Sequence, residues 1–382
     1  MHVFVIAGEP SGDRLGTALM AGLKALVPGI RFSGVGGAGM AGEGLSSLFP
    51  MDELSVMGIA EILPKYRHLK RRIAQTARAV IDTAPDVLIT IDSPDFCLRV
   101  ARQVKAASDI RTVHYVAPTV WAWRPGRAQK MAQVIDHVLA LFPFEPPLMQ
   151  AAGMRCDFVG HPVVAEPVPS AQDQAALRAR FDLGEAPVLL ALPGSRRGEV
   201  GRLAPVFGAA IDRYLAARPD MRVIVPAAGP VAHVVRDLTA DWPGSAIVLD
   251  PAEHDDFPTL KRGAFGAAEL ALAASGTVSL ELAAAATPMV IAYRFNWLSW
   301  QIISRMAIVD TVTLVNLVSD TRVVPECLGP ACTAENIAKA LDDVARSPDL
   351  QRDAMALTMQ RLGQDGQAPG LRAAHAVLDG LS

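Results

Sequence analysis

Polar side chains follow two of the short apolar runs that we predict as β-strands. Asp92 comes directly after the run Val87–Ile91, and Ser11 and Asp13 lie in the glycine-containing loop after the first strand. A carboxylate at the carboxyl end of a parallel strand faces the ligand-binding edge of the sheet, where it can accept a proton or orient a hydroxyl. Asp95 is the more natural cap for the helix that follows, so Asp92 is the better acid–base candidate. Ser11 and Asp13 fit either a binding loop or the cap of the next helix.

Two loops in the second half carry residue types that bind phosphate. They contain Gly194, Ser195 and Arg196 in the first and Ser275, Gly276 and Thr277 in the second. In the first, backbone amides beside a forked guanidinium suit a diphosphate, although a solvated basic turn is the alternative. The second begins a helix whose free amides and positive dipole end attract anions. Glu281 lies one turn into that apolar helix, where an unpaired carboxylate is costly, so we expect a polar partner such as a ribose hydroxyl.

Two of the five tryptophans, Trp121 and Trp123, lie just beyond the predicted strand 112–116. Core packing would account for one tryptophan at a strand end. A pair flanked by Arg124 and Arg127 is more typical of a binding wall with a polar rim. We therefore place both rings among the candidate residues of an acceptor or cleft loop.

Several common site motifs are missing or incomplete. Gly34–Gly39 satisfies Gly-x-Gly-x-x-Gly, but residues 40–48 make a poor helix, so the pyrophosphate-binding helix start is doubtful. No lysine follows a glycine, which excludes a Walker A loop, and no Asp-x-Asp or His-x-x-x-His pattern offers a metal site. We expect no metal and no cofactor, and assign the charge of a leaving diphosphate to Arg196 and helix amides.

The elements that must position these loops alternate along the chain. Short apolar runs separated by longer helix-compatible segments are the pattern of βαβ units and mostly parallel sheets. The predicted strands are 3–7, 87–91, 112–116, 138–141 and 157–159, then 188–192, 222–226, 246–249, 270–273 and 288–293. The predicted helices are 15–26, 69–83, 99–106, 203–217 and 278–286.

Prolines mark the boundary between the two halves of this pattern. Pro162, Pro167 and Pro169 interrupt an apolar stretch that has no periodicity. We predict an α/β fold of two facing Rossmann-like, doubly wound domains with a ligand-binding cleft between them. The domains are 1–165 and 166–345, and a C-terminal helical segment, 346–382, is expected to pack back on the first domain.

Composition narrows the function classes. Among 382 residues, 36 Lys and Arg against 39 Asp and Glu give a net charge of −3, so the chain has no positive surplus for nucleic acid. Four cysteines without Cys-x-x-Cys spacing indicate reduced thiols, and the first residues lack the features of a signal peptide. A cytoplasmic location is the expectation, and no segment is predicted to span a bilayer.

In order and spacing, these motifs resemble the lipid-A-disaccharide synthase family, and the resemblance extends along nearly the whole chain. The tryptophan-containing segment is its most specific part. The matching positions are 7–13, 56–58, 92–96, 114–118, 120–124, 142–145, 160–161, 192–196, 274–277, Glu281 and Asn316.

The resemblance implies an inverting glycosyltransferase of the GT-B type, with an acceptor- or lipid-side first domain and a UDP-sugar-binding second domain. It would transfer 2,3-diacylglucosamine from UDP-2,3-diacylglucosamine to 2,3-diacylglucosamine 1-phosphate, giving a β-1,6 disaccharide 1-phosphate and UDP. By the same resemblance Asp92 and Arg196 are catalytic, Asn316 belongs to the donor site and Glu281 binds the ribose. Arg197 departs from the family pattern and leaves open which guanidinium meets the diphosphate.

Acylated substrates imply contact with a membrane surface. The segment 56–63 is apolar and is followed by Lys65, Arg67, Lys70, Arg71 and Arg72. Such a pattern suits an anionic lipid surface, and equally an amphipathic helix with a solvated basic face. The expected location is therefore peripheral, on the inner face of the inner membrane. A homo-oligomer stays open.

Two other function classes also stay open. One is a nucleotide-dependent dehydrogenase that uses Gly34, Gly36 and Gly39, and the other is a lipid-binding module without catalysis. NADH binding, UDP binding and disaccharide formation would distinguish the three.

Overall fold

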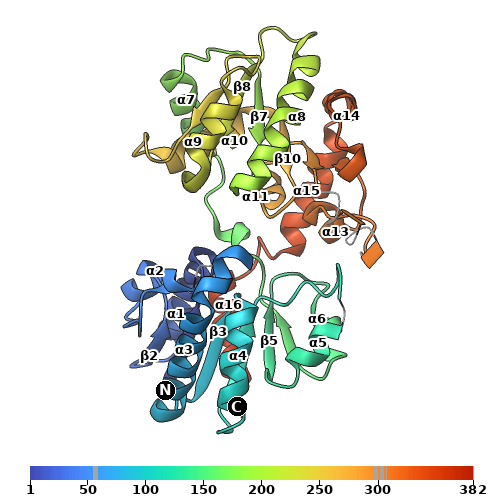
Figure 1. Cartoon of the computed structure of the whole chain (residues 1–382). Helices are drawn as coiled ribbons and strands as arrows, with labels where there is room; N and C mark the ends of the chain where they lie inside the picture. The colour runs from blue at the N-terminus through green and yellow to red at the C-terminus, as the bar shows by residue number, and fades with distance from the viewer. Residues whose placement is uncertain (55–58, 125, 296–299, 302–304, 307, 382) are drawn as a thin grey trace. The chain divides into compact units, whose positions relative to one another are not determined.

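The structure is a computed structural model that describes residues 1–382 except 55–58, 125, 296–299, 302–304, 307 and 382, and it leaves the side chains of 59–66 undescribed. The chain forms two units (Figure 1). Unit 1 is Met1–Ala165 with Leu362–Ser382, and unit 2 is Glu166–Arg361. Each contains a six-stranded sheet flanked by helices, which confirms the predicted α/β class.

The sheet of unit 1 is parallel throughout, in the order β2-β1-β3-β4-β5-β6. Its strands are β1 (His2–Ala7), β2 (Arg31–Val35), β3 (Val87–Ile91), β4 (Arg111–Tyr115), β5 (His137–Ala140) and β6 (Arg155–Phe158). The chain runs outward from β1 in one direction to β2 and in the other to β3. This reversal between β1 and β3 is a topological switch point, where doubly wound sheets bind ligands.

The helices of unit 1 include one from the end of the chain. They are α1 (Pro10–Leu26), α2 (Ala38–Gly42), α3 (Ile59–Thr83), α4 (Pro94–Lys105), α5 (Gly126–Met131), α6 (Pro146–Gln150) and α16 (Pro369–Asp379). Helix α16, red in Figure 1, packs on α1 among the blue elements. A Cβ on Gly370 would lie 2.5 Å from the Ala18 carbonyl oxygen, so glycine is what allows the two helices to approach this closely.

The sheet of unit 2 is also parallel, in the order β12-β11-β10-β7-β8-β9. Its strands are β7 (Val188–Leu192), β8 (Arg222–Pro226), β9 (Ile247–Leu249), β10 (Ala268–Ala274), β11 (Met289–Tyr293) and β12 (Glu326–Leu328). Its helices are α7 (Ala171–Arg180), α8 (Arg197–Leu215), α9 (Ala232–Thr239), α10 (Phe257–Ala267), α11 (Val278–Ala284), α13 (Leu314–Ser319), α14 (Ala334–Arg346) and α15 (Asp349–Arg361). The segment expected as one piece, 346–382, is shared, because α15 belongs to unit 2 and α16 to unit 1.

The cores follow from the apolar runs. All five residues of β3 and of β7 are buried, as expected for parallel strands covered by helices on both faces. Four helices begin earlier than predicted, α1 at Pro10, α3 at Ile59, α4 at Pro94 and α8 at Arg197. In α1 and α4 a proline occupies the first turn, where its missing N–H is no loss.

Candidate active site

The carboxyl end of β3 has a strained backbone. Asp92 and Ser93 both adopt left-handed conformations, with φ of 49° and 42°, and Val116 after the neighbouring β4 has φ of 84°. Such angles are uncommon outside glycine, and for a β-branched valine they are a genuine outlier. Strain of this kind gathers at functional sites, and here it lies at strand ends beside the switch point of unit 1.

The backbone of Asp92 is fixed at this turn, and its carboxylate has no partner among the described residues. Its backbone amide donates to the Tyr115 carbonyl oxygen at 3.0 Å, which fixes the turn to the neighbouring strand. The side chain is partly exposed, and no hydrogen bond or ion pair of its carboxylate joins it to the described part of the chain. A Cβ on Gly8 would lie 2.6 Å from the Ser93 hydroxyl, so the loop after β1 closes against the same turn. Asp95 is exposed in the first turn of α4.

Asp13 has a structural partner that the sequence did not indicate. Helix α1 begins at Pro10, before Asp13, so of the two roles left open for Asp13 the cap of α1 is excluded. Its carboxylate accepts the amides of Gly37, Gly39 and Met40 at 2.8, 2.9 and 3.1 Å, and so caps α2. Ser11 is exposed on the first turn of α1.

This cap also accounts for the Gly-x-Gly-x-x-Gly motif. The amides of Gly37 and Gly39, which a dinucleotide pyrophosphate would use, donate instead to Asp13. The helix after the motif is only five residues long, which gives little dipole to attract an anion. A dinucleotide-binding motif needs free loop amides and a helix start that attracts the pyrophosphate, and this loop offers neither to a dehydrogenase cofactor.

The two tryptophans have different surroundings. The Trp121 indole Nε1 donates to the Glu145 carboxylate at 3.3 Å, and its ring meets Phe144 edge-to-face with centroids 5.4 Å apart. Trp123 is partly exposed, with the Arg124 guanidinium 4.3 Å above its ring. Trp121 therefore belongs to a packed aromatic cluster, whereas Trp123 and its cation lie at the surface.

Glu145 is a buried carboxyl that the sequence reasoning did not select as a site residue. It is 2% exposed and accepts the amides of Leu141 and Phe142 at 3.1 and 3.0 Å in addition to the indole of Trp121. Burial raises the pKa of Glu145 to about 7, although the three donors act in the opposite direction. One feature of the sequence could have pointed to Glu145. It lies in a segment that matches the family, and its partner Trp121, 24 residues earlier, lies in another such segment.

In unit 2, the loop after β7 has one of its amides already occupied. Gly194 has φ of +120°, and the Ser195 amide donates to Glu199 Oε2 at 3.0 Å. That amide is therefore not free for a diphosphate unless the Glu199 side chain moves. Arg196 and Arg197 at the start of α8 are exposed, which leaves their guanidiniums available.

In the loop after β10, no backbone amide of residues 275–277 donates a hydrogen bond to the described residues. Gly276 has φ of +155°, and a Cβ there would meet nothing within 4 Å. Ser275 is partly exposed, Gly276 and Thr277 are exposed, and the loop leads directly into α11. Glu281 on that helix has the polar partner that we expected, but it is the Lys261 ammonium at 2.5 Å. Its side chain is 40% exposed, so it still faces solvent.

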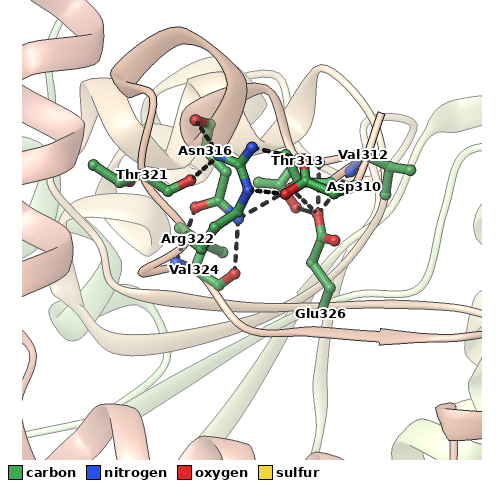
Figure 2. Close-up of polar contacts among 9 residues, drawn as sticks. Asp310, Val312, Thr313, Asn316, Thr321, Arg322, Val324 and Glu326 are labelled. Atoms are coloured by element: carbon green, nitrogen blue, oxygen red, sulfur yellow. Dashed lines mark hydrogen bonds and ion pairs between the residues drawn. The ribbon is translucent and has the colours of Figure 1, made fainter. Parts of the chain in front are cut away.

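Asn316 lies inside a hydrogen-bonded network (Figure 2). It is 1% exposed, and its Nδ2 donates to Thr311 Oγ1 at 3.2 Å and to the Val324 carbonyl oxygen at 2.9 Å. Its Oδ1 accepts the Val324 amide at 3.0 Å. Both amide hydrogens are thus used within the protein.

The segment that we expect to contact lipid is only partly described. Residues 56–58 lie outside the described residues, as do the side chains of 59–63 and of Lys65. Of the basic residues beyond, Arg67, Lys70 and Arg71 are exposed. Arg72 instead forms a two-bonded ion pair with Glu53, through Nε at 2.7 Å and Nη2 at 2.7 Å.

The described residues form neither a metal-binding cluster nor a membrane-spanning helix. Among the residues whose placement is described, no three His, Cys, Asp or Glu side chains gather as a metal site would require. Within the same part of the chain, no helix is both long and apolar enough to cross a bilayer.

Comparison with known proteins decides the family. The family model described as lipid-A-disaccharide synthetase matches residues 3–372. A lipid-A-disaccharide synthase of Ruegeria pomeroyi is 68% identical over 383 residues, covering 100% of this chain and 96% of its own. The chain belongs to the lipid-A-disaccharide synthase family. A further lipid-A-disaccharide synthase, from Rhodospirillum centenum, is 46% identical and covers 99% of this chain and 94% of its own.

Membership of the lipid-A-disaccharide synthase family confirms the predicted family and the predicted enzyme class, a glycosyltransferase, and does not favour the dehydrogenase or the lipid-binding module. Solved structures show the fold. A UDP-GlcNAc 2-epimerase from Neisseria meningitidis, bound to UDP-GlcNAc, has a TM-score of 0.66 at 12% identity and covers 100% of this chain and 99% of its own. The glycotransferase of kitacinnamycin has a TM-score of 0.64 at 15% identity, with 100% and 99% coverage. The two-domain Rossmann-like fold of the GT-B class is thereby confirmed.

Proposed function

We propose that this synthase transfers 2,3-diacylglucosamine from its UDP ester to the 6-hydroxyl of 2,3-diacylglucosamine 1-phosphate, with Asp92 as the general base. One observation carries the proposal: a carboxylate with no hydrogen bond or ion pair to the described residues lies on a strained turn at the switch point of the unit 1 sheet. A carboxylate without a partner among the described residues is available to accept a proton, and strained backbone of this kind gathers at functional sites.

The transfer is a single displacement. The acceptor oxygen attacks the anomeric carbon on the face opposite UDP, its proton passes to Asp92, and the bond from that carbon to the diphosphate oxygen breaks. Inversion at the anomeric carbon gives the β-1,6 linkage. The negative charge that develops on the diphosphate requires cations or amides in place before the reaction.

Unit 2 supplies those groups in the proposal. Arg196 offers an exposed guanidinium without a partner among the described residues, and Gly276 and Thr277 are exposed at the start of α11. Glu281 is available to the ribose from its partly exposed position next to Lys261. The exposed Ser11 and the partly exposed Trp123 are proposed for the acceptor side, because their side chains, unlike that of Asp13, make no hydrogen bond within the described part of the chain.

The test of the base is Asp92→Asn. Asparagine tolerates the left-handed conformation, so the variant removes basicity and leaves the turn in place. A positioned base contributes about 10²–10⁴-fold, so the single-turnover rate should fall by that factor while UDP affinity is retained. Asp95→Asn is the matched control, since Asp95 is an exposed carboxylate three residues on. A rate within twofold of wild type for Asp92→Asn would remove Asp92 from the mechanism.

We further propose that the protein works at the inner face of the inner membrane, attached peripherally from the cytoplasm. Both substrates carry acyl chains, which have to leave and re-enter a bilayer. Exposed Arg67, Lys70 and Arg71 on α3 support contact with an anionic surface.

A further inference from the structure

A tightly bonded stretch closes the long connection between β11 and β12. It runs from Asp310 to Glu326 and includes helix α13, and we name it the 310–326 clasp (Figure 2). It has an inner set of bonds around Glu326 and Asn316 and an outer ion pair between Asp310 and Arg322.

The inner set converges on one oxygen. Glu326 Oε1 accepts from the Thr311 hydroxyl at 2.7 Å, from the amides of Val312 and Thr313 at 2.9 and 2.7 Å, and from the Thr313 hydroxyl at 2.5 Å. Four donors around one oxygen require a strong acceptor, which a carboxylate oxygen provides. Without it, the backbone amides of Val312 and Thr313 just before α13 would lose their acceptor in a partly buried place, which costs free energy.

The outer pair is solvated. Arg322 binds Asp310 through Nε at 2.9 Å and Nη2 at 2.6 Å, but the two side chains are 46% and 72% exposed. Exposed ion pairs contribute about 0–1 kcal/mol, so the inner set holds the clasp.

Helix α13, which the clasp fixes, packs against α11 and α15. Its backbone is further tied to α15, because Thr358 Oγ1 donates to the Val315 carbonyl oxygen at 3.3 Å and Arg361 Nη1 to that of Val318 at 2.7 Å. Helix α11 begins directly after the loop Ser275–Thr277. A contiguous path of packed elements therefore runs from Glu326 to the donor loop.

We propose that Glu326 and Asn316 are positioning residues for donor binding: they fix α13, and through it α11 and the loop that receives the diphosphate. Asn316 then acts without touching the substrate, because both its amide hydrogens are already bonded inside the clasp. The inference rests on the proposed function, which places the UDP moiety at that loop.

The experiment combines UDP titration calorimetry with amide hydrogen exchange. The variants are Glu326→Ala, Glu326→Gln, Asn316→Ala, their double alanine variant and, as the matched control, Asp310→Asn. Residues that act on a distant site through packed elements change the coupling free energy by about 0.5–2 kcal/mol. Each alanine substitution should therefore weaken UDP binding by about 2- to 30-fold. Glutamine keeps an acceptor oxygen and should restore most of the affinity.

The double variant should bind UDP no more weakly than the worse single variant, because the two residues serve one network. Exchange at α13 and α11 should rise in Glu326→Ala and stay at the wild-type level in Asp310→Asn. Normal UDP affinity in Glu326→Ala beside a large loss in Asn316→Ala would overturn the proposal and make Asn316 a direct contact.

Exchange separates this inference from the proposed function. Failure of the wild-type protein to bind UDP would refute the proposed donor site, whatever the exchange pattern. Unchanged exchange at α11 in folded Glu326→Ala would refute the positioning path even if wild-type UDP binding were normal.

Discussion

The two arginines after β7 allow a sharp test of which guanidinium holds the donor diphosphate. Arg196 and Arg197 are both exposed, and neither guanidinium makes a hydrogen bond or ion pair within the described part of the chain. Replacing either should change stability by no more than about 0.5 kcal/mol, since nothing in the fold depends on it. A hydrogen bond to a charged group contributes about 1.5–3 kcal/mol, so Arg196→Ala should weaken UDP binding by about 10- to 150-fold.

The assay is calorimetric titration of UDP into wild-type, Arg196→Ala, Arg196→Lys and Arg197→Ala proteins, after melting curves show that all four are folded. Lysine keeps the charge but not the fork, so its affinity should lie between those of wild type and alanine. Arg197→Ala should bind within about twofold of wild type, because a neighbouring surface charge that misses the ligand acts only through screened electrostatics. Wild-type affinity in Arg196→Ala, or the larger loss in Arg197→Ala, would refute the assignment.

Three further predictions concern stability and lipid binding. Gly194→Ala should lower the free energy of unfolding by about 1–3 kcal/mol in urea titrations, because φ of +120° strains alanine and its Cβ would overlap the Glu199 side chain. Equal urea midpoints for the variant and the wild type would contradict this prediction. As pH rises from 4.5 to about 7, Glu145 should lower the stability of the wild-type protein, because the folded carboxyl keeps a proton that the unfolded one has released. Glu145→Gln should lack this part of the pH dependence. The same dependence of stability on pH in both proteins would contradict the prediction. Arg67→Glu with Lys70→Glu should reduce sedimentation with anionic vesicles at low salt, and unchanged sedimentation would argue against the α3 surface.

The local hydrophobic pattern of the sequence was enough to predict the strands that are buried on both faces. Val87–Ile91 and Val188–Leu192 read as unbroken apolar runs because helices cover both sides of a parallel sheet. β2 was missed since Arg31 and Ser33 break its apolar character at an edge of the sheet. β12 was missed because three residues give no period to recognise.

The candidate site was less accessible to sequence, because its contacts join distant residues. The place of Asp92 follows from its strand, but its left-handed backbone depends on packing against neighbouring strands. The partners of Asp13 come 24 to 27 residues later, and Lys261 precedes Glu281 by 20 residues. The resemblance drew attention to Asn316, and only the structure shows that its amide is used up within the clasp.

The most direct test of the central claim is a product analysis of the wild-type protein with the two diacylglucosamine substrates. Mass spectrometry and proton NMR would follow sugar products and UDP in the same reaction. The account predicts one UDP released for each disaccharide formed, a β-anomeric linkage, and negligible UDP release when the acceptor is omitted. Acceptor-independent UDP release, or conversion of the UDP-sugar to its 2-epimer without disaccharide, would contradict it.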